Sequence, residues 1–464
     1  MDCSVILEVR NKLVNIISNT PIKMKTVPVL TAILICALTF GSYAQGFDKL
    51  KLDQFLELIE TNNRGMGSFS LMKDGKEVYS KAYGFAQAEK GGKPNHDTQY
   101  RIGSISKMYT AVIIMKLVEQ KKLKLDQKIN RFLPDIPNAD KITIEHLLRH
   151  RSGLHNFTDD ADYFTYLEKP QTEKEMLDRI KEKGTDFEPD QQAEYSNTNY
   201  YLLTLIAEKA SAKKFNVLLN DFIIQPCGLK HTSYAGPIPG NINWAASYTR
   251  LAEWTPATRT DLSIPAGAGA ILSTPTEVNI FLSNLYTGKL LKTETVNTMK
   301  KTIDTYGIGM FEIPFYDKKG YGHTGGIDGF HTIAVHFEKD NVSAAIFSNG
   351  EVMSLNDILL GALSIYFDKE FDLPVFTPEI ILSEDELEPL TGVYSSPTFP
   401  MKITITREQN KLIAQATGQP GFPLEAYEKD KFRFEQAHLT IEFVQQEQTL
   451  ILRQGGGMFE LKKE

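Results

Sequence analysis

A helical period of apolar residues opens the part of the chain that we expect to fold. Apolar side chains recur three and four positions apart, as on one face of an amphipathic helix (Phe47, Leu50, Leu52, Phe55, Leu56 and Ile59). Residues 69–73 and 76–79 then flank Asp74-Gly75, a pair that favours a tight hairpin turn. The pattern predicts one helix within residues 45–63, followed by a β-hairpin whose second strand continues toward Phe85.

A second helical period follows Ser104, with apolar residues at Met108, Ala111, Val112, Met115 and Val118. Further helices are expected at 172–183, at 200–207 and from the capping box Thr274-Pro275-Thr276-Glu277 to about Leu285. Two strands are expected at 331–337 and 342–347, with the turn at Asp340-Asn341. Helices and strands therefore alternate over most of the chain.

Two segments suggest a cleft. Residues 156–190 are polar and aromatic, which is typical of a variable loop region above a binding site. Residues 266–272 consist of glycine, alanine and two larger apolar residues, so the backbone there is expected to approach another segment closely.

The chain changes character after about residue 375. Pro374, Pro378 and the acidic residues of 383–390 indicate a linker, which we place at 376–390. Short alternating strands follow at 401–405, 439–443 and 449–452. We therefore predict one large domain over 45–375 and a small antiparallel barrel or sandwich over 391–464, interpreted as a stabilising accessory rather than a binding module.

Residues 1–44 resemble an N-terminal extension and a secretory signal peptide. A basic start at Met24-Lys25 precedes an apolar run from Val27 to Phe40, and small residues at 42–44 favour cleavage between Ala44 and Gln45. The apolar run is short for a membrane span, which needs about 20 residues. We expect export, with the mature protein in the periplasm and without a stable membrane span. An uncleaved anchor is the alternative, and Met1 or Met24 is the start.

Composition excludes one class of partner and one kind of cross-link. The 464 residues carry a net charge of −7 without a basic cluster, which argues against nucleic acid binding. Of the cysteines Cys3, Cys36 and Cys227, only Cys227 remains after cleavage, so no intrachain disulfide is expected. We interpret Cys227 as a buried structural thiol.

The candidate chemistry begins with Ser-x-x-Lys, which occurs three times in the chain. On a helix the two side chains lie one turn apart on the same face, so the lysine can activate the serine. Ser70 and Lys73 lie on a predicted strand, where positions three apart face opposite sides, and Ser211 closes a helix. Only Ser104 opens a helix, where the dipole and free N–H groups favour a developing oxyanion. An ordinary N-cap serine is the alternative.

Two other motifs have structural interpretations. His146, His150 and His155 lack the spacing and the acidic partner of a metal site, so we interpret them as structural and expect no metal. The glycine-rich segment 320–330 lies between predicted strands, with no helix start behind it and no Lys-Ser/Thr, which argues against a phosphate loop.

Three motifs in order carry a resemblance: Ser104-Ile105-Ser106-Lys107, Tyr195-Ser196-Asn197 and His323-Thr324-Gly325. Together they resemble the serine β-lactamase and penicillin-binding protein superfamily, in its class C β-lactamase-like (peptidase S12-type) branch. Segments 146–154 and 225–233 are also similar to that family. The resemblance implies an α/β β-lactamase-like sandwich, with an antiparallel sheet flanked by helices and a helical region.

The resemblance also implies roles for the site. Ser104 is the nucleophile, and Lys107 and Tyr195 share the base work, for which either needs a lowered pKa. Asn197 contacts the substrate, and the strand with His323, Thr324 and Gly325 forms one wall of the cleft. The N–H groups of Ser104 and Gly326 are the implied oxyanion hole. No cofactor is needed.

His323 departs from the family pattern, in which a lysine at this position helps to hold a substrate carboxylate. Histidine is mostly neutral at neutral pH, so weaker selection for carboxylate-bearing β-lactams is expected. The predicted function is an exported serine hydrolase with a small-molecule or peptide substrate: an esterase, a D-amino-acid peptidase or a D-Ala-D-Ala carboxypeptidase-like enzyme, with weak β-lactamase activity left open. The alternative is a non-catalytic penicillin-binding-like sensor. The oligomeric state is left open.

Overall fold

The structure is a computed structural model that describes residues 47–236, 243–250, 253–434, 437, 439–454 and 457–464. The predictions for residues 1–44, including the signal peptide and its cleavage site, lie outside the described residues. Within the described part of the chain, no helix has the length and apolar character that a membrane crossing requires.

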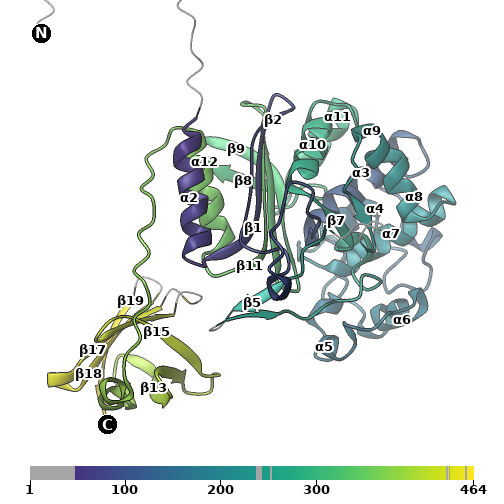
Figure 1. Cartoon of the computed structure of the whole chain (residues 1–464). Helices are drawn as coiled ribbons and strands as arrows, with labels where there is room; N and C mark the ends of the chain where they lie inside the picture. The colour runs from purple at the N-terminus through teal and green to yellow at the C-terminus, as the bar shows by residue number, and fades with distance from the viewer. Residues whose placement is uncertain (1–46, 237–242, 251–252, 435–436, 438, 455–456) are drawn as a thin grey trace, which may run out of the picture. The chain divides into compact units, whose positions relative to one another are not determined.

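A six-stranded antiparallel sheet forms the centre of the larger domain (Figure 1), with strand order β2-β1-β11-β10-β9-β8. Its strands are β1 (Gly65–Lys73), β2 (Lys76–Tyr83), β8 (Phe311–Phe315), β9 (Lys318–Ile327), β10 (Phe330–Phe337) and β11 (Val342–Glu351). Side chains alternate between its two faces, so each face has its own apolar core. The predicted hairpin at Asp74-Gly75 and the two strands around residue 340 are confirmed.

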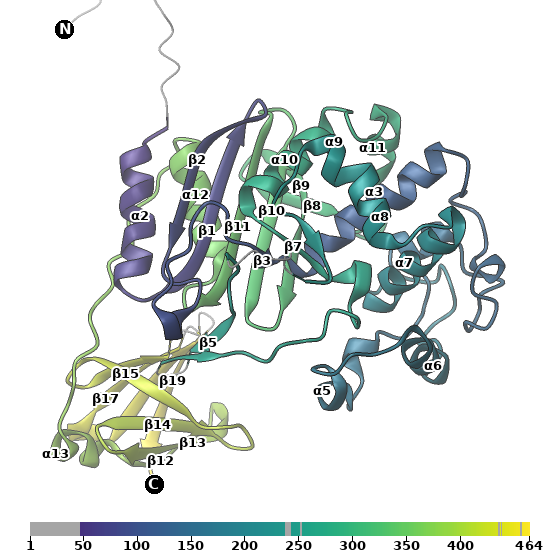
Figure 2. The same ribbon diagram turned by 45° about the vertical axis from the view of Figure 1, so that its right-hand side comes forward.

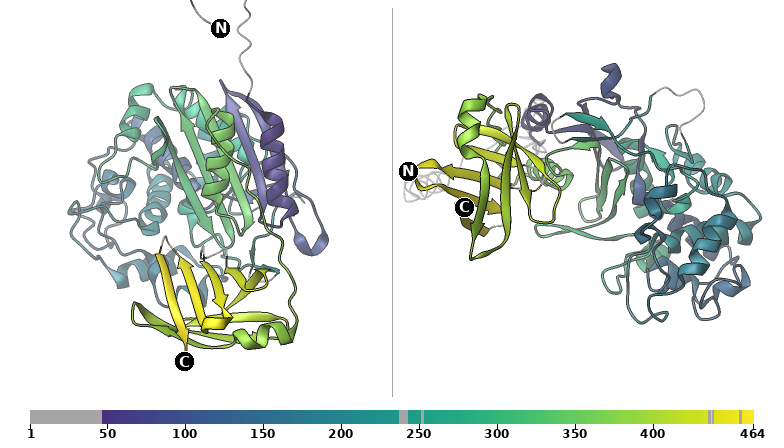
Figure 3. Two further views of the ribbon diagram at one scale, coloured as in Figure 1. Left: turned by 90° about the vertical axis from the view of Figure 1, so that its left-hand side faces the viewer. Right: turned by 90° about the horizontal axis from the view of Figure 1, so that it is seen from below.

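Helices cover both faces of this sheet. On one face lie α2 (Lys49–Thr61) and α12 (Leu355–Tyr366), which pack against it through apolar residues such as Phe55 and Ile358. The left view of Figure 3 shows this pair in front of the strands. On the other face lie α10 (Pro275–Tyr286) and the helical region around α3 (Ser106–Glu119), as Figure 2 shows. This arrangement confirms the predicted α/β sandwich.

The helical region contains further helices and two small sheets. Its helices are α4 (Ile144–Leu148), α5 (Tyr163–Tyr166), α6 (Glu173–Lys183), α7 (Asn197–Ser211), α8 (Phe215–Leu219), α9 (Gln225–Cys227) and α11 (Thr293–Lys300). Two small sheets join them, namely β3 (Tyr100–Arg101), β7 (Ile271–Ser273) and β4 (Ser233–Tyr234), and β5 (Tyr248–Arg250) with β6 (Trp254–Pro256). The helices predicted near 172–183 and 200–207 are confirmed.

One local prediction needs correction. The Thr274 side chain caps α10, but the Glu277 carboxylate does not complete a capping box. It accepts hydrogen bonds from the backbone N–H groups of Lys230 and His231 and from the Thr232 hydroxyl instead. Most of the glycine-rich segment within 320–330 belongs to β9, which agrees with the strand that the resemblance implies for His323, Thr324 and Gly325.

The C-terminal strands close into a barrel of eight, which confirms the predicted all-β unit. They are β12 (Gly392–Ser396), β13 (Phe399–Glu408), β14 (Lys411–Ala416), β15 (Phe422–Glu428), β16 (Lys431–Phe434), β17 (Leu439–Val444), β18 (Thr449–Gln454) and β19 (Gly457–Lys463). The acidic segment that we expected to be a linker forms helical turns, α13 (Glu384–Leu387) and Glu388–Leu390. Leu382, Leu387 and Leu390 from this segment pack into the barrel core.

Candidate active site

Ser104 lies in a tight helical turn that leads into α3. Residues Gly103–Ile105 form one 3-10 turn, and α3 begins at Ser106, two residues later than the sequence suggested. Gly103 has φ of 50°, a left-handed conformation that glycine adopts without strain. The turn leaves the Ser104 hydroxyl at the cavity surface and puts Lys107 in the first turn of α3, where its side chain is fully buried.

Lys107 Nζ lies within hydrogen-bonding distance of three oxygen atoms. They are Ser104 Oγ at 3.0 Å, Asn197 Oδ1 at 2.8 Å and the Ala268 carbonyl at 2.9 Å. A neutral amine has two N–H bonds for Asn197 and Ala268, which leaves its lone pair for the Ser104 hydroxyl proton. After that proton moves, the ammonium has three N–H bonds for the same three oxygens. The site therefore satisfies both protonation states that a general base needs.

Burial determines which state Lys107 favours at rest. Loss of hydration penalises the ammonium and lowers the pKa of Lys107 well below its usual 10.5. No carboxylate takes part in the three hydrogen bonds described above to offset that penalty. The lysine is therefore suited to accept a proton from Ser104.

Tyr195 packs beside these groups as a neutral phenol. Lys107 Nζ lies 4.8 Å from the centre of the Tyr195 ring. Burial raises the pKa of Tyr195, and a hydrogen bond with Ser104 opposes that rise only in part. The lowered pKa that Tyr195 would need as a base is therefore not found, because removing water disfavours a phenolate just as it disfavours an ammonium. Tyr195 in this state is a hydrogen-bond donor.

His150 supports Tyr195, a contact that the sequence analysis missed. The two rings stack with centroids 4.5 Å apart and planes 27° apart. His150 Nδ1 accepts a hydrogen bond from the backbone N–H of Ser196 at 3.1 Å. Burial lowers the pKa of His150 well below 6.5, so the ring is neutral. The segment 146–154 resembles the family, but only the fold shows which ring this histidine touches.

Asn197 is held from the side opposite Lys107. Its backbone N–H donates to Asn156 Oδ1 at 2.9 Å, and its side-chain Nδ2 donates to Thr158 Oγ1 at 3.1 Å. Ser196, which precedes it, occupies the N-cap position of α7 without a side-chain cap. Asn156 and Thr158 are therefore positioning groups that the sequence analysis did not name.

The third motif lies on β9, and its residues are divided between the two faces of the strand. His323 is buried, with its ring centroid 6.3 Å from that of Tyr195 and 4.6 Å from that of Phe311. Burial and the nearby Lys107 lower the pKa of His323 to about 3, so it is neutral. Thr324 is exposed on the other face. The structure thus brings His323 toward Tyr195 but does not bring Thr324 into the cavity lining.

The backbone of β9 lies against the turn that holds Ser104. This close contact explains why positions 103 and 325 are glycine. A Cβ atom on Gly103 would lie 2.9 Å from Gly326 N, and one on Gly325 would lie 3.1 Å from Ser104 N and 2.2 Å from the Ile102 carbonyl. Gly326 itself faces open space and lines the cavity. The backbones of Ser104 and Gly326 thus lie side by side at the cavity, the arrangement that an oxyanion hole requires.

An ion pair joins the two sides of this contact. Arg101 Nη1 lies 2.9 Å from Asp328 Oδ2, and both side chains are nearly buried. Asp328 Oδ1 accepts hydrogen bonds from Thr260 N at 2.8 Å and Thr260 Oγ1 at 2.6 Å. Arg101 lies three residues before Ser104 and Asp328 two residues after Gly326. The pair therefore fixes the spacing of the two segments, although the sequence analysis assigned no role to either residue.

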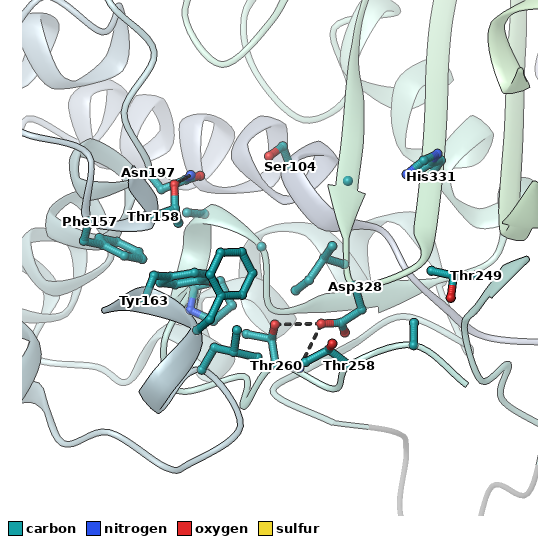
Figure 4. A pocket seen from close by; sticks show the side chains of 18 of the residues that line it. Ser104, Phe157, Thr158, Tyr163, Asn197, Thr249, Thr258, Thr260, Asp328 and His331 are labelled. Carbon is teal, nitrogen blue, oxygen red and sulfur yellow. Dashed lines mark hydrogen bonds between the residues drawn. The ribbon is translucent and has the colours of Figure 1, made fainter. Parts of the chain in front are cut away.

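Ser104 opens into a cavity of about 530 Å³, shown in Figure 4. Ser104, Asn197, Gly326 and Asp328 line it, together with apolar residues of 157–167 and the segment 256–260. This volume suits a small organic ligand. The prediction that 156–190 borders a cleft is confirmed for its first part.

The remaining histidines and Cys227 lie in other settings. His146 forms the capping box of α4 with Thr143, and His155 lies between Asp160 and Asp186. Across the described residues, no group of three or more histidine, cysteine, aspartate or glutamate side chains has the arrangement of a metal site. Cys227 is partly buried, and burial raises the pKa of its thiol to about 11.

Fold and comparisons together define a serine hydrolase of the β-lactamase and penicillin-binding protein superfamily. A family model described as Beta-lactamase matches residues 53–360, so the chain belongs to the beta-lactamase family. The predicted resemblance is thereby confirmed.

The relatives whose names state a specific activity are only 25% identical to this chain. The chain is 25% identical over 282 residues to a teichoic acid D-alanine hydrolase from Staphylococcus aureus, which covers 59% of this chain and 68% of the relative. The D-amino acid amidase from Ochrobactrum anthropi SV3, complexed with D-phenylalanine, is 25% identical with a TM-score of 0.61, over 68% of this chain and 99% of that one. The octameric penicillin-binding protein homologue from Pyrococcus abyssi is 24% identical with a TM-score of 0.62, over 90% and 100% of the two chains, and shows the shared fold.

Proposed function

We propose that this protein is an exported serine hydrolase that cleaves small esters or amides of D-amino acids through an acyl-enzyme on Ser104. One observation carries the proposal: the buried Lys107 amine contacts Ser104 Oγ, Asn197 Oδ1 and the Ala268 carbonyl, and all three contacts suit both its neutral and its protonated form. A structural lysine has no need of such a reversible arrangement.

Acylation begins when Ser104 Oγ attacks the substrate carbonyl carbon. The hydroxyl proton moves to Lys107 Nζ as the Oγ–C bond forms, and the carbonyl oxygen becomes an oxyanion between the N–H groups of Ser104 and Gly326. The bond from carbon to the leaving oxygen or nitrogen then breaks. Tyr195, a neutral phenol beside Ser104, delivers a proton to the leaving group and regains one from Lys107.

Deacylation reverses the proton path. A water molecule attacks the acyl carbon, Lys107 takes one of its protons, and the bond from carbon to Ser104 Oγ breaks. The proton returns to Oγ, so the net reaction consumes one water and releases an acid and an alcohol or amine. His323, Gly325 and Asn197 act in this scheme by shaping the site around the acyl group.

The proposed substrate class is supported by charge as well as by the relatives' names. His323 is neutral, and no lysine or arginine is among the described residues that line the cavity. A substrate carboxylate next to the reacting bond therefore lacks a fixed cation, which disfavours β-lactams and D-Ala-D-Ala peptides. Esters and amides of amino acids lack that carboxylate, and both D-specific relatives act on or bind D-amino acid groups by name.

The proposal of export rests on the sequence of residues 24–44 alone. The barrel over 391–464 is proposed as an accessory.

The test follows the intact mass of the purified protein with D-amino acid methyl esters and with a simple penicillin, together with product release. Ser104-dependent ester hydrolysis and a transient acyl adduct are expected, and Ser104→Ala should abolish both. The matched control is Ser211→Ala, the same change in another Ser-x-x-Lys sequence. Full activity in Ser104→Ala would refute the assignment, whereas rapid penicillin consumption with inert esters would favour a β-lactamase.

A further inference from the structure

The cavity above Ser104 has one apolar wall that the proposed reaction does not use. Phe157, Tyr163, Phe164 and Leu167 line the cavity and come from the short stretch around α5. We call this group the apolar wall. Figure 4 shows Phe157 and Tyr163 on the same side as Asn197 and Thr158, with His331 on the opposite side.

Phe164 is the unusual member of this wall. Phe157 and Leu167 are buried, as expected for apolar side chains, but Phe164 remains 81% exposed. An exposed aromatic ring at the edge of a cavity contributes little to folding and offers apolar surface to a ligand. Its neighbour Tyr163 contacts it edge to face, with ring centroids 5.7 Å apart.

The wall is supported by the buried Tyr166 ring and the half-buried Arg179 behind it. The Tyr163 ring packs against Tyr166 at 5.5 Å and 84°, and the Arg179 guanidinium lies 3.8 Å from the Tyr166 ring centre. The backbone N–H of Asp261 donates to the Leu167 carbonyl at 2.7 Å, which ties the end of the wall to the segment that follows Thr260. Tyr163 and Leu167 are therefore held in place before a ligand binds, so binding costs little ordering of this part of the wall.

The position of the wall identifies which part of a substrate it meets. Thr158 directly follows Phe157 and accepts a hydrogen bond from Asn197 Nδ2 at 3.1 Å. Asn197 contacts the acyl portion in the proposed mechanism, so the wall borders the acyl side of the reacting carbonyl. The charged groups across the cavity are already paired, Asp328 with Arg101 and His331 with Glu351. The apolar wall therefore offers an acyl group next to Asn197 a contact for an uncharged, apolar side chain.

We propose that the apolar wall binds a large apolar side chain on the acyl portion, so that the preferred substrates are esters or amides of aromatic or bulky aliphatic D-amino acids rather than of D-alanine. This inference rests on the proposed function and specifies its substrate. A phenyl ring placed against Phe157, Tyr163 and Phe164 gains both burial and edge-to-face contact, which a methyl group cannot make.

The test compares kcat/KM for D-phenylalanine methyl ester and D-alanine methyl ester in wild type, Phe164→Ala and Tyr316→Ala. Tyr316 is a matched control, because it is a 67% exposed aromatic residue outside the cavity lining. Wild type should prefer the D-phenylalanine ester by at least about tenfold. Phe164→Ala should reduce that preference about fivefold, mainly through KM, while the D-alanine ester changes less than about twofold. Tyr316→Ala should match wild type.

The possible failures are distinguishable. Ser104-dependent hydrolysis with equal or greater activity on the D-alanine ester would overturn the apolar-wall inference alone. An equal loss on both esters in Phe164→Ala would do the same, because it would indicate a general structural role. No hydrolysis of either ester above the level of Ser104→Ala would overturn the proposed function and with it this inference. Phe164→Leu, which keeps an apolar side chain, should retain part of the preference.

Discussion

Lys107 and Lys73 each stand three residues after a serine, but their surroundings differ in every respect that matters for catalysis. Lys107 is fully buried on a helix and contacts Ser104 and two other oxygens. Lys73 lies at the end of β1 with 40% of its side chain exposed and Asp74 at 3.5 Å. Ser70, its partner in the motif, contacts Glu77 and Asn279 instead. Of these two motifs, only the one at Ser104 combines a helix that aligns serine with lysine and burial that removes water from the amine.

Replacing each lysine by methionine gives the largest expected contrast. Lys107→Met removes the proton acceptor for Ser104, and loss of a general base costs roughly 10² to 10⁴-fold in rate. We expect kcat on a D-amino acid ester to fall about a thousandfold. Lys73→Met should stay within about twofold, because its ion pair is exposed. Steady-state kinetics on both variants, with circular dichroism to verify folding, makes this comparison, and comparable losses in the two would contradict it.

Introducing a carboxylate beside Lys107 should make its setting more like that of Lys73. Asn197 Oδ1 lies 2.8 Å from Lys107 Nζ, and Asn197→Asp replaces the amide with a group of the same shape. An opposite charge at this distance raises a lysine pKa by about one to three units. The base must be neutral, so kcat/KM is lost as pH falls through the pKa of Lys107. In wild type burial places that loss well below pH 10.5, and in the variant the loss moves to higher pH.

The pH dependence of kcat/KM measures this shift directly. At neutral pH the variant should lose about ten- to a hundredfold, because each unit of pKa shift costs tenfold in the neutral fraction. Much of the activity should return at alkaline pH. Asn197→Ala is the comparison, since it removes the amide without adding charge. A loss in Asn197→Asp that stayed constant with pH would mean that Asn197 acts only by contact with the substrate.

Some features of the site around Lys107 can be predicted from the sequence, and others depend on the tertiary fold. The helical period after Ser104 is local, so the position of Ser104 and Lys107 on one helix could be predicted. The acceptors of Lys107 could not, because the Ala268 carbonyl lies 161 residues away and reaches it only through the tertiary fold. The same holds for the stacking of His150 on Tyr195, which no spacing rule contains. Tyr195 and His323 were identified only through the resemblance to a family.

The C-terminal barrel also has parts that can be predicted from the sequence and one part that cannot. Strict alternation made its strands predictable, as in β17, where Leu439, Ile441 and Phe443 point inward. The acidic residues of 383–390 suggest a linker, whereas the structure gives this segment two helical turns. Its leucines occur at the spacing of a helical turn, and only the neighbouring strands show that they complete a core. Charge marks the exposed side of a short element but does not show what its other side covers.

His150 tests whether support behind the Tyr195 ring matters for the reaction. His150→Gln keeps an acceptor for the Ser196 N–H but removes the ring that stacks on Tyr195 at 4.5 Å. Loss of orientation in a catalytic group lowers kcat, so we expect kcat to fall about tenfold with KM changed less than about twofold. His150→Phe keeps a ring but loses the acceptor, and it should retain more of kcat than His150→Gln if stacking dominates. Equal loss in both, or a rise in KM alone, would contradict a positioning role.

A substitution at Thr158 is expected to have the smallest effect on activity, because Thr158 contacts Asn197 and not Lys107 itself. Thr158→Val preserves shape and removes the acceptor for Asn197 Nδ2, a hydrogen bond of 3.1 Å. One such bond is worth about 0.5 to 1.5 kcal/mol, so kcat/KM should fall about two- to tenfold if Asn197 loses its orientation. The backbone N–H of Asn197 remains bound to Asn156, which limits the loss.

Adding Thr158→Val to Asn197→Ala should change nothing further, because the hydroxyl then has no partner to orient. A full additive loss in that double variant would show that Thr158 contacts the substrate itself, and the acyl side of the cavity would then have a polar contact beside its apolar wall.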